Sequence, residues 1–386
     1  MKKILLVAGI VLLTCCSDKQ LLPEIIPPEP SVETGLPENV PGQPSKEWYM
    51  GRTAEVGITQ KVPIIQVGYK TRDRKFFFES AHFDFVTASS NVTTVFQAAS
   101  VSKALFSYIV MRLVDKGVID LDRPLYEYTG GVVEERFRDA IPGDPVASAR
   151  NEAWAKLLTA RIILTHGSGL PNWMLNGWPS NAKLVFTYEP DTRYIYSGEG
   201  IHYLQRVIEH ITGQKLNQLA DQEVFGPLGM IYSSYVWRDD YPTLHAWGYN
   251  TEMVKGSQGT SSYFTEGNAA FTLRTNVRDF SLFLEALMEG RGLTPETFKA
   301  YFTPQRQIEN DSYFGLGIRV TTNLAFGYGP LWSHGGSNPG FRCHFLIWPK
   351  DQTYLVYFSN GDNGAGTALS RLFNIFFPQY PGTTGF

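Results

Sequence analysis

Phe96-Gln97-Ala98-Ala99-Ser100-Val101-Ser102-Lys103 is the stretch from which the rest of the chain can be interpreted. Residues 91–97, which lead into this stretch and include its first two residues, form an extended, β-prone run. After it, apolar side chains recur at three- and four-residue spacings from Leu105 to Val114, which predicts a buried helix. Ser100 is therefore expected to open that helix, with Lys103 beside it on the same helix face.

The Ser100 hydroxyl and the Lys103 amine are a candidate nucleophile and base. The partial positive charge of a helix N-terminus favours both an alkoxide and a neutral amine. Because a free Lys has a pKa of about 10.4, the base role requires burial that lowers this pKa to about 7. Ser180-Asn181-Ala182-Lys183 repeats the spacing, but it follows Trp178-Pro179 in a polar stretch without such a setting. The competing interpretation of Ser100 is a hydroxyl that caps a core helix.

Two later segments supply further candidates, Tyr196-Ser197-Gly198 and His334-Gly335-Gly336-Ser337. The Tyr196 phenol can relay a proton to the leaving atom of an acyl donor. Gly335 and Gly336 let an edge strand approach a substrate closely and leave backbone N–H groups aimed into a cleft. Together the three segments indicate a serine acyltransferase that uses Lys and Tyr in place of a His–Asp pair.

The motifs and their order resemble those of the serine β-lactamase and penicillin-binding-protein-like family, closest to its class C and esterase branch. The first segment, with Leu113 to Asp122 after it, is similar to the family's first motif, and His334-Gly335-Gly336 is similar to its third. Leu164-Thr165-His166-Gly167-Ser168-Gly169-Leu170-Pro171 and Pro227-Leu228-Gly229-Met230 resemble two further family segments. The resemblance spans roughly residues 60 to 360.

The resemblance implies an α/β (α+β) architecture with a β-lactamase-like fold. An antiparallel sheet flanked by helices would be joined to a mostly helical subdomain within about 118–275, with the active site in the cleft between them. The whole hydrolase domain would occupy residues 46–386. The family's two oxyanion donors map to the backbone N–H groups of Ser100 and Ser337, and Gly335 and Gly336 map to substrate-binding positions.

Three positions near these motifs need separate interpretation. His334 stands where many family members have Lys, and we expect it to act in catalysis by donating a hydrogen bond to a substrate carboxylate or to Tyr196. Gly198 occupies a substrate-binding place where most members have an Asn that holds a substrate amide, so its presence favours a carboxylesterase or an uncommon amidase. Glu199 is either a substitute polar group or a surface residue. Arg342 is either a carboxylate-binding residue or a structural Arg.

Hydrophobic periodicity predicts several elements independently of the resemblance. The expected helices are Glu152–Leu164, Gly200–Ile211, Val277–Met288 and Ala365–Phe377. The expected strands, which would form a meander, are Phe314–Val320, Phe341–Ile347 and Thr353–Ser359.

The N-terminus predicts export to a bacterial cell envelope. Lys2 and Lys3 precede an apolar run, Ile4–Leu13, that is too short to span a bilayer and is typical of a secretion signal. Leu13-Thr14-Cys15-Cys16 resembles a lipoprotein cleavage site, which gives a signal peptide at residues 1–16 and Cys16 as lipid acceptor. Cys15 is the second choice, and secretion without lipid is the alternative. Residues 17–45 are Pro-rich and are expected to form a mobile tether from a lipid anchor in the periplasm or outer membrane.

Composition and missing motifs limit the other functions. The formal net charge of −3 and the dispersed basic residues argue against a nucleic-acid partner. The sequence has no Gly-x-Ser-x-Gly, His-Glu-x-x-His, Cys-x-x-Cys or phosphate-loop motif, so neither metal nor cofactor is expected. The expected partner is a small-molecule or cell-wall-derived acyl substrate. Two further hypotheses are a penicillin-sensing module that is acylated without turnover and a catalytically silent envelope scaffold.

Overall fold

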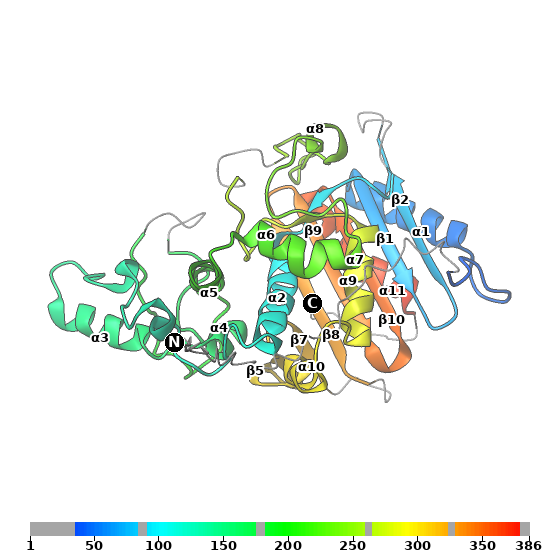
Figure 1. The fold of residues 1–386 in the computed structure, drawn as a ribbon. Helices are drawn as coiled ribbons and strands as arrows, with labels where there is room; N and C mark the ends of the chain where they lie inside the picture. Colours follow the sequence, from blue (N-terminus) through cyan, green and yellow to red (C-terminus); the bar gives the residue numbers. More distant parts are fainter. Residues whose placement is uncertain (1–34, 84–90, 175–181, 259–264, 323–328, 379–386) are drawn as a thin grey trace, which may run out of the picture.

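An eight-stranded antiparallel sheet carries the fold in the computed structural model, which describes residues 35–83, 91–174, 182–258, 265–322 and 329–378. The strand order is β2-β1-β10-β9-β8-β7-β6-β5 (Figure 1). Its strands are β1 (Ile64–Lys70), β2 (Lys75–Ala81), β5 (Arg306–Glu309), β6 (Ser312–Phe314), β7 (Arg319–Thr321), β8 (Leu331–Asn338), β9 (Phe341–Trp348) and β10 (Thr353–Ser359).

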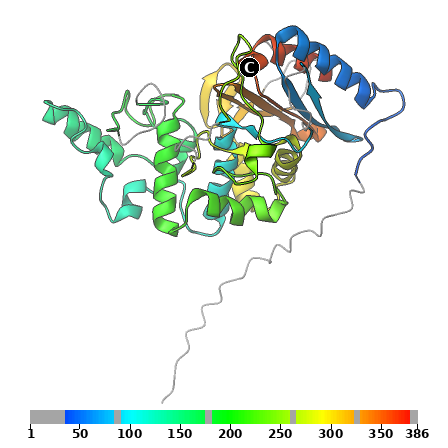
Figure 2. The ribbon, with the colours of Figure 1, turned by 90° about the horizontal axis from the view of Figure 1, so that it is seen from above.

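Helices cover both faces of the sheet, as Figure 2 shows from above. On one face α1 (Lys46–Gln60) and α11 (Thr367–Phe376) share a cluster of buried apolar side chains, in which the Tyr49 and Phe376 rings stack 4.7 Å apart. On the other face lie α2 (Ser102–Asp115) and α9 (Val277–Glu289), with α10 (Pro295–Phe302) packed beside α2. The sheet is thus the middle of three layers, which makes α2 a rigid support.

The chain between α2 and α9 supplies the remaining helices and forms a second, mostly helical region. They are α3 (Pro145–Ala155), α4 (Ala160–Leu164), α5 (Gly198–Thr212), α6 (Leu216–Ala220), α7 (Gly226–Leu228) and α8 (Tyr241–Leu244). Strands β3 (Phe96–Gln97) and β4 (Arg274–Thr275) form a short antiparallel ladder that joins the two ends of this segment. The ladder therefore places the residues just after β3 beside those just before β4, and the predicted nucleophile lies among the first group.

Most predicted elements are present, and two are wrong in the same way. Strands β9 and β10 and helices α5, α9 and α11 match their predictions to within two residues at each end. The single helix predicted over 152–164 is two helices, because the Thr159 side chain accepts a hydrogen bond from Ile162 N and starts α4 afresh. The single strand predicted over 314–320 is broken between β6 and β7, where Gly317 has a φ of +88°.

The described chain begins after the predicted signal peptide and Cys16, which lie outside the described residues, as does Ser180. From residue 35 to the start of α1 there is neither helix nor strand. This segment contacts the β1–β2 turn, where Pro44 O accepts from Arg74 Nη1 at 2.7 Å and Pro37 O accepts from Lys75 N at 3.2 Å. No helix in the described part of the chain has the length and apolar character needed to cross a bilayer.

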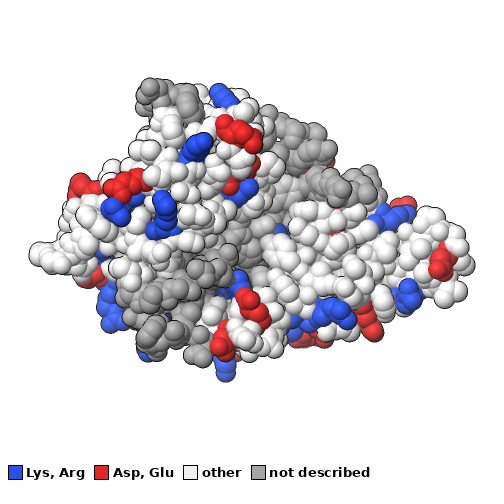
Figure 3. Space-filling model, turned by 180° about the vertical axis from the view of Figure 1, so that it is seen from behind, with Lys and Arg blue, Asp and Glu red and all other residues white. Residues whose placement is uncertain are grey.

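Charged side chains of both signs are interspersed on the face drawn in Figure 3, with uncharged surface between them. The distribution agrees with the small net charge of the whole chain. This face therefore offers no broad field of one sign that would steer a polyanion or a polycation toward the molecule.

Candidate active site

Ser100 lies in a tight 3₁₀ turn, Ala99–Val101, two residues before the helix that it was expected to open. Ala99 has a φ of 45°, a left-handed conformation that costs a non-glycine residue about 1 kcal/mol or more. Ala98 holds the turn, since its N–H donates to Leu273 O at 2.8 Å and its carbonyl accepts from Cys343 Sγ at 3.0 Å. The strained turn thus fixes the nucleophile at the N-terminal end of α2.

Lys103 is buried, with 1 % of its surface exposed. Its Nζ donates to Ser100 Oγ at 3.2 Å and to Ala270 O at 2.7 Å, and it lies 4.8 Å from the centre of the Tyr196 ring. No carboxylate compensates this burial in the hydrogen bonds of the amine, and desolvation lowers the pKa of Lys103 to about 7. About half of the amine is therefore neutral at neutral pH and can accept the Ser100 proton.

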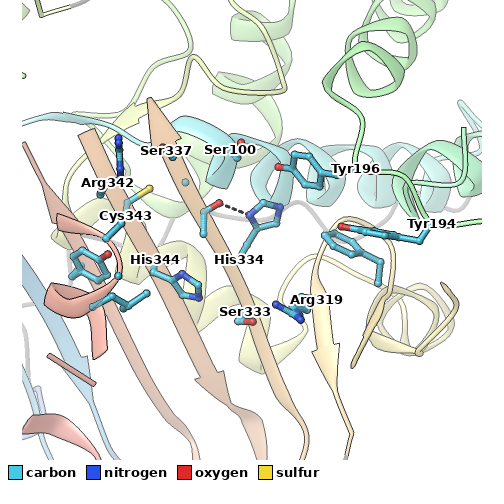
Figure 4. Close-up of a pocket in the computed structure, with 17 residues that line it drawn as sticks. Ser100, Tyr194, Tyr196, Arg319, Ser333, His334, Ser337, Arg342, Cys343 and His344 are labelled. Atoms are coloured by element: carbon cyan, nitrogen blue, oxygen red, sulfur yellow. Dashed lines mark hydrogen bonds between the residues drawn. The ribbon is translucent and has the colours of Figure 1, made fainter. Parts of the chain in front are cut away.

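Tyr196 completes the cluster from the helical region. Figure 4 shows its hydroxyl directed toward Ser100. Burial raises the pKa of Tyr196 well above its ordinary value, and the nearby Ser100 hydroxyl opposes this only in part. The phenol consequently stays protonated near neutral pH, which suits a proton relay better than a standing phenolate base.

His334, on β8, faces the same cavity but uses its donor elsewhere. Its Nδ1 lies 2.8 Å from Gly335 O, and because a carbonyl only accepts, Nδ1 carries the proton (Figure 4). Burial, aided by the Lys103 charge, lowers the pKa of His334 to about 3, so the ring is neutral. This tautomer leaves Nε2 as an acceptor, so the expected donation by His334 to a substrate carboxylate or to Tyr196 would require the other tautomer and stays a prediction.

The end of β8 passes close to the nucleophile because two of its residues lack side chains. A Cβ on Gly336 would stand 2.6 Å from Ala98 O, and one on Gly335 would stand 2.7 Å from His344 Nδ1. Strand β7 pairs with β8 only as far as Ser333, so the following residues border the cleft as an edge. This geometry agrees with the predicted approach of the Ser337 backbone to the Ser100 turn.

Gly198 is the first residue of α5 and lies against an aromatic ring. Its N–H donates to Asn172 Oδ1 at 2.9 Å, and a Cβ built on it would lie 2.5 Å from the Trp173 indole. Trp173 in turn meets Phe271 edge-to-face at 5.5 Å. Phe271 directly follows Ala270, whose carbonyl accepts from Lys103, so the Trp173 indole lies beside the site. It occupies the space that a side chain at position 198 would need.

Glu199 is buried and is not among the residues that line the cavity beside Ser100, so the surface interpretation is wrong. It has 1 % of its surface exposed, and its Oε1 accepts from Met174 N at 3.2 Å. Arg136 lies 3.7 Å from its other oxygen. The carboxylate thereby fixes the loop that carries Trp173.

A cavity of about 390 Å³ adjoins Ser100 and runs along β8. Aromatic side chains and two guanidinium groups, but no acidic side chain, belong to its described lining, which includes Tyr194, Phe314, Arg319, Arg342 and His344. Arg342 forms an ion pair with Asp362 at 2.8 Å and donates to Asn338 O at 2.6 Å. Its predicted carboxylate-binding role thus competes with a structural use of the same group.

Three residues that line or support the site were not predicted as functional. His166 contacts Tyr196, Trp173 contacts Gly198, and Arg319 extends into the cavity from β7 (Figure 4). His166 belongs to a segment that resembles one of the family's segments, so the sequence could have identified it as a candidate. Nothing in the sequence singled out Trp173 or Arg319. Among the described residues, no group of three or more His, Cys, Asp or Glu side chains is placed to hold a metal ion.

Comparisons with known proteins agree with this geometry. A family model described as Beta-lactamase matches residues 80–377. Penicillin-binding protein 4* of Bacillus subtilis is 22% identical over 69% of this chain and 61% of its own length. Esterase EstB of Burkholderia gladioli is 30% identical over 46% of this chain and 48% of its own. The matches thus cover less than two thirds of either relative.

Solved structures share the fold at low identity. The D-amino acid amidase of Ochrobactrum anthropi superposes with a TM-score of 0.66 at 19% identity, over 86% of this chain and 98% of that one. The D-alanine carboxypeptidase AmpC of Burkholderia cenocepacia gives 0.66 at 16% identity, over 84% and 97%. These similarities confirm the predicted β-lactamase-like fold.

Proposed function

Because the chain belongs to the beta-lactamase family, we propose that it is a serine hydrolase that forms an acyl-enzyme at Ser100 and acts preferentially on carboxylic esters. The observation that carries the proposal is the contact of 3.2 Å between Ser100 Oγ and the buried Lys103 amine. Burial gives Lys103 a pKa of about 7, which matches the demand on a general base near neutral pH.

In the proposed acylation step, Lys103 takes the Ser100 proton as Oγ bonds to the carbonyl carbon. The resulting oxyanion is stabilised by the backbone N–H groups of Ser100 and Ser337. When the bond to the leaving oxygen breaks, Tyr196 gives that oxygen a proton and regains one from the Lys103 ammonium. The proton of Ser100 has then moved to the released alcohol, and the amine is neutral again.

Water completes the proposed cycle. It attacks the acyl carbon while its proton passes to the same Tyr196–Lys103 pair. As the ester bond to Ser100 breaks, that pair returns the proton to Ser100 Oγ. The products are a carboxylic acid and free enzyme. Each proton transfer in this cycle falls on Ser100, Lys103 or Tyr196, so no metal or cofactor enters a step.

The ester preference rests on Gly198 and Trp173. An amide substrate needs a partner for its N–H and carbonyl groups, and a site that leaves such groups unpaired rejects them. At position 198 the site offers no side chain, and the indole that fills the space is apolar on its faces. An ester carries no N–H that requires a partner there.

A second candidate activity is cleavage of a small amide that carries a free carboxylate. The observation in its favour is the cavity along β8, whose described lining includes Arg319 and Arg342 but no acidic side chain. A carboxylate placed there would gain charge-assisted hydrogen bonds.

A substrate panel tests the proposal. Purified protein would be given p-nitrophenyl butyrate, a D-alanyl-D-alanine peptide and a fluorescent β-lactam, with turnover and covalent stoichiometry recorded for each. The expected result is many turnovers of the ester and slower cleavage of the peptide. One equivalent of label without turnover would indicate a sensing module, and no label with any substrate would indicate a silent scaffold.

We also propose that the protein is anchored to the bacterial envelope through a lipid on Cys16. The motif Leu13-Thr14-Cys15-Cys16 and the Pro-rich segment that follows support this location. Metabolic labelling with a palmitate analogue should mark the wild type but not Cys16→Ser. Labelling that persists in Cys16→Ser and disappears in Cys15→Ser would assign the lipid to the other cysteine.

A further inference from the structure

His166 lies directly behind the relay tyrosine. It is fully buried, and its ring centre is 4.3 Å from that of Tyr196 and 4.6 Å from that of Phe314. Its φ of 56° is a left-handed conformation that few non-glycine residues adopt. A strained, buried, polar residue beside a catalytic group needs a reason beyond filling space.

The backbone on both sides of Tyr196 is bonded to this one residue. Ser197 N donates to His166 Nδ1 at 3.1 Å, and Ile195 N donates to His166 O at 2.8 Å. From residue 182 to 197 the chain has neither helix nor strand, so no ladder of regular bonds fixes Tyr196. The two contacts to His166 therefore clamp the phenol from behind while its hydroxyl faces Ser100.

The imidazole must be neutral to make this clamp. Nδ1 accepts a hydrogen bond, so the ring proton is on Nε2. Burial lowers the pKa of His166 well below its ordinary value, and the neighbouring Lys103 charge adds to the effect. The acceptor is consequently available over the whole range in which Lys103 titrates.

A purely packing role would not require a histidine. Nε2 has no hydrogen-bond partner among the described residues, so burying the imidazole costs desolvation that a phenyl ring would avoid. What an imidazole supplies and a phenyl ring does not is the acceptor for Ser197 N. An Asn side chain can also supply such an acceptor, and Asn tolerates a left-handed backbone better than other residues with a Cβ.

We propose that His166 is a positioning residue for proton relay, which holds Tyr196 at Ser100 through the bond from Ser197 N to Nδ1. The proposal rests on the proposed acyl-enzyme function, because it matters only if Tyr196 protonates a leaving group. It predicts that loss of the Nδ1 acceptor lowers kcat/KM most for substrates whose leaving group must be protonated.

Two esters of one acid separate positioning from packing. p-Nitrophenyl butyrate releases a stable phenolate, whereas ethyl butyrate must be protonated as it leaves, and both give the same butyryl-enzyme. His166→Phe keeps the ring but loses the acceptor; His166→Asn keeps an acceptor but loses the ring. We expect His166→Phe to lower kcat/KM by about 10²-fold for the ethyl ester but less than tenfold for the nitrophenyl ester. His166→Asn should recover most of the loss.

A double-mutant cycle covers the case in which His166→Phe is poorly folded. Active protein would be counted by fluorophosphonate titration, and the substitution would be repeated in Tyr196→Phe. If His166 acts through the Tyr196 phenol, His166→Phe should lower kcat/KM for the ethyl ester by less than about threefold in the Tyr196→Phe background.

Several results would overturn the proposal. Equal losses on the two esters, an Asn variant no better than the Phe variant, or full additivity with Tyr196→Phe would each leave His166 as a packing residue only. Wild-type protein that forms no acyl-enzyme with either ester would refute the proposed function itself, and the proposal with it.

Discussion

The two walls of the cleft are built by different means. On the sheet side, backbone contacts set the geometry: Gly336 lets β8 pass beside Ala98, and the turn before α2 presents Ser100. On the helical side, Tyr196 and Gly198 take their places from side chains, His166 behind one and Trp173 against the other. The sheet wall therefore depends on the absence of side chains, and the helical wall depends on their identity.

This difference teaches where chemistry and selectivity reside. In the proposed mechanism, the sheet wall carries the nucleophile and the oxyanion donors, whose geometry has little tolerance. In the same mechanism, the helical wall carries the proton relay, Tyr196, and Trp173, which lies against Gly198. These side chains can change with a few substitutions. Variants of the sheet wall should accordingly abolish activity, whereas variants of the helical wall should redistribute it among substrates.

The largest effect is expected for Ser100→Ala. It should reduce ester turnover by about 10⁴-fold or more, because nucleophile and base act as one unit, and it should end labelling by a fluorophosphonate. The melting temperature should change little. Ser102→Ala is the matched control on the same turn: its Oγ accepts from Leu273 N at 3.0 Å, so its loss should cost about 1 kcal/mol of unfolding free energy and retain labelling. Continued labelling of Ser100→Ala would remove the nucleophile assignment.

A methyl group on the sheet wall should have the next largest effect. Gly336→Ala would place Cβ 2.5 Å from Cys343 Sγ and 2.6 Å from Ala98 O, which forces β8 away from Ser100. Loss of one oxyanion donor predicts a fall in kcat of about 10²- to 10³-fold. Gly51→Ala, on a helix with nothing within 4 Å of the new atom, is the control and should keep full activity. Unchanged kcat in Gly336→Ala would show that β8 does not bind the oxyanion.

The titration of Lys103 should give a graded effect. The base is the neutral amine, and burial lowers its pKa to about 7, so activity is present above this pH and is lost as pH falls through it. Below the midpoint kcat/KM should drop about tenfold per pH unit. The measurement is kcat/KM for p-nitrophenyl butyrate from pH 5 to 9, corrected for spontaneous hydrolysis. A midpoint near 10 would mean that Lys103 is an ordinary, solvated amine.

The smallest effect concerns the helical wall. Gly198→Asn alone should be destabilised and should leave the ratio of amide to ester rate constants unchanged, because its Cβ meets the Trp173 ring. Trp173→Ala/Gly198→Asn should raise that ratio by about 5- to 10-fold, as the new amide gains room to bind a substrate amide. Trp173→Ala alone is the control for the opened space. A stable single variant with an increased ratio would show that the indole does not block position 198.

The sequence predicted the sheet wall better than the helical wall, for a physical reason. The motif from Ser100 to Lys103 acts through local spacing across a 3₁₀ turn and the start of α2, and the Gly-Gly pair acts through backbone shape. Both can be inferred from neighbouring residues. The Trp173 contact joins residues 25 positions apart through an irregular loop. The donor of His334 goes to the adjacent carbonyl, a choice of rotamer that no periodicity encodes.

The two errors in secondary structure have different origins. Thr159 begins a new helix inside an apolar pattern that looks continuous, because a side-chain cap competes with helix propagation. The break before β7 occurs where Gly317 packs against α2, since a Cβ built on it would lie 2.4 Å from the Ser107 side chain. The first interruption is thus set by a local side-chain cap, and the second by close packing against another element.

The most direct test of the central claim is to locate the acyl group itself. Protein mixed with p-nitrophenyl butyrate would be quenched in acid within the burst and digested with trypsin, which separates Ser100 on residues 76–103 from Ser180 on residues 162–183. The account predicts a butyryl adduct on Ser100, found by fragmentation, that disappears as turnover proceeds. An adduct on Ser180, or a burst without any adduct on residues 76–103, would contradict it.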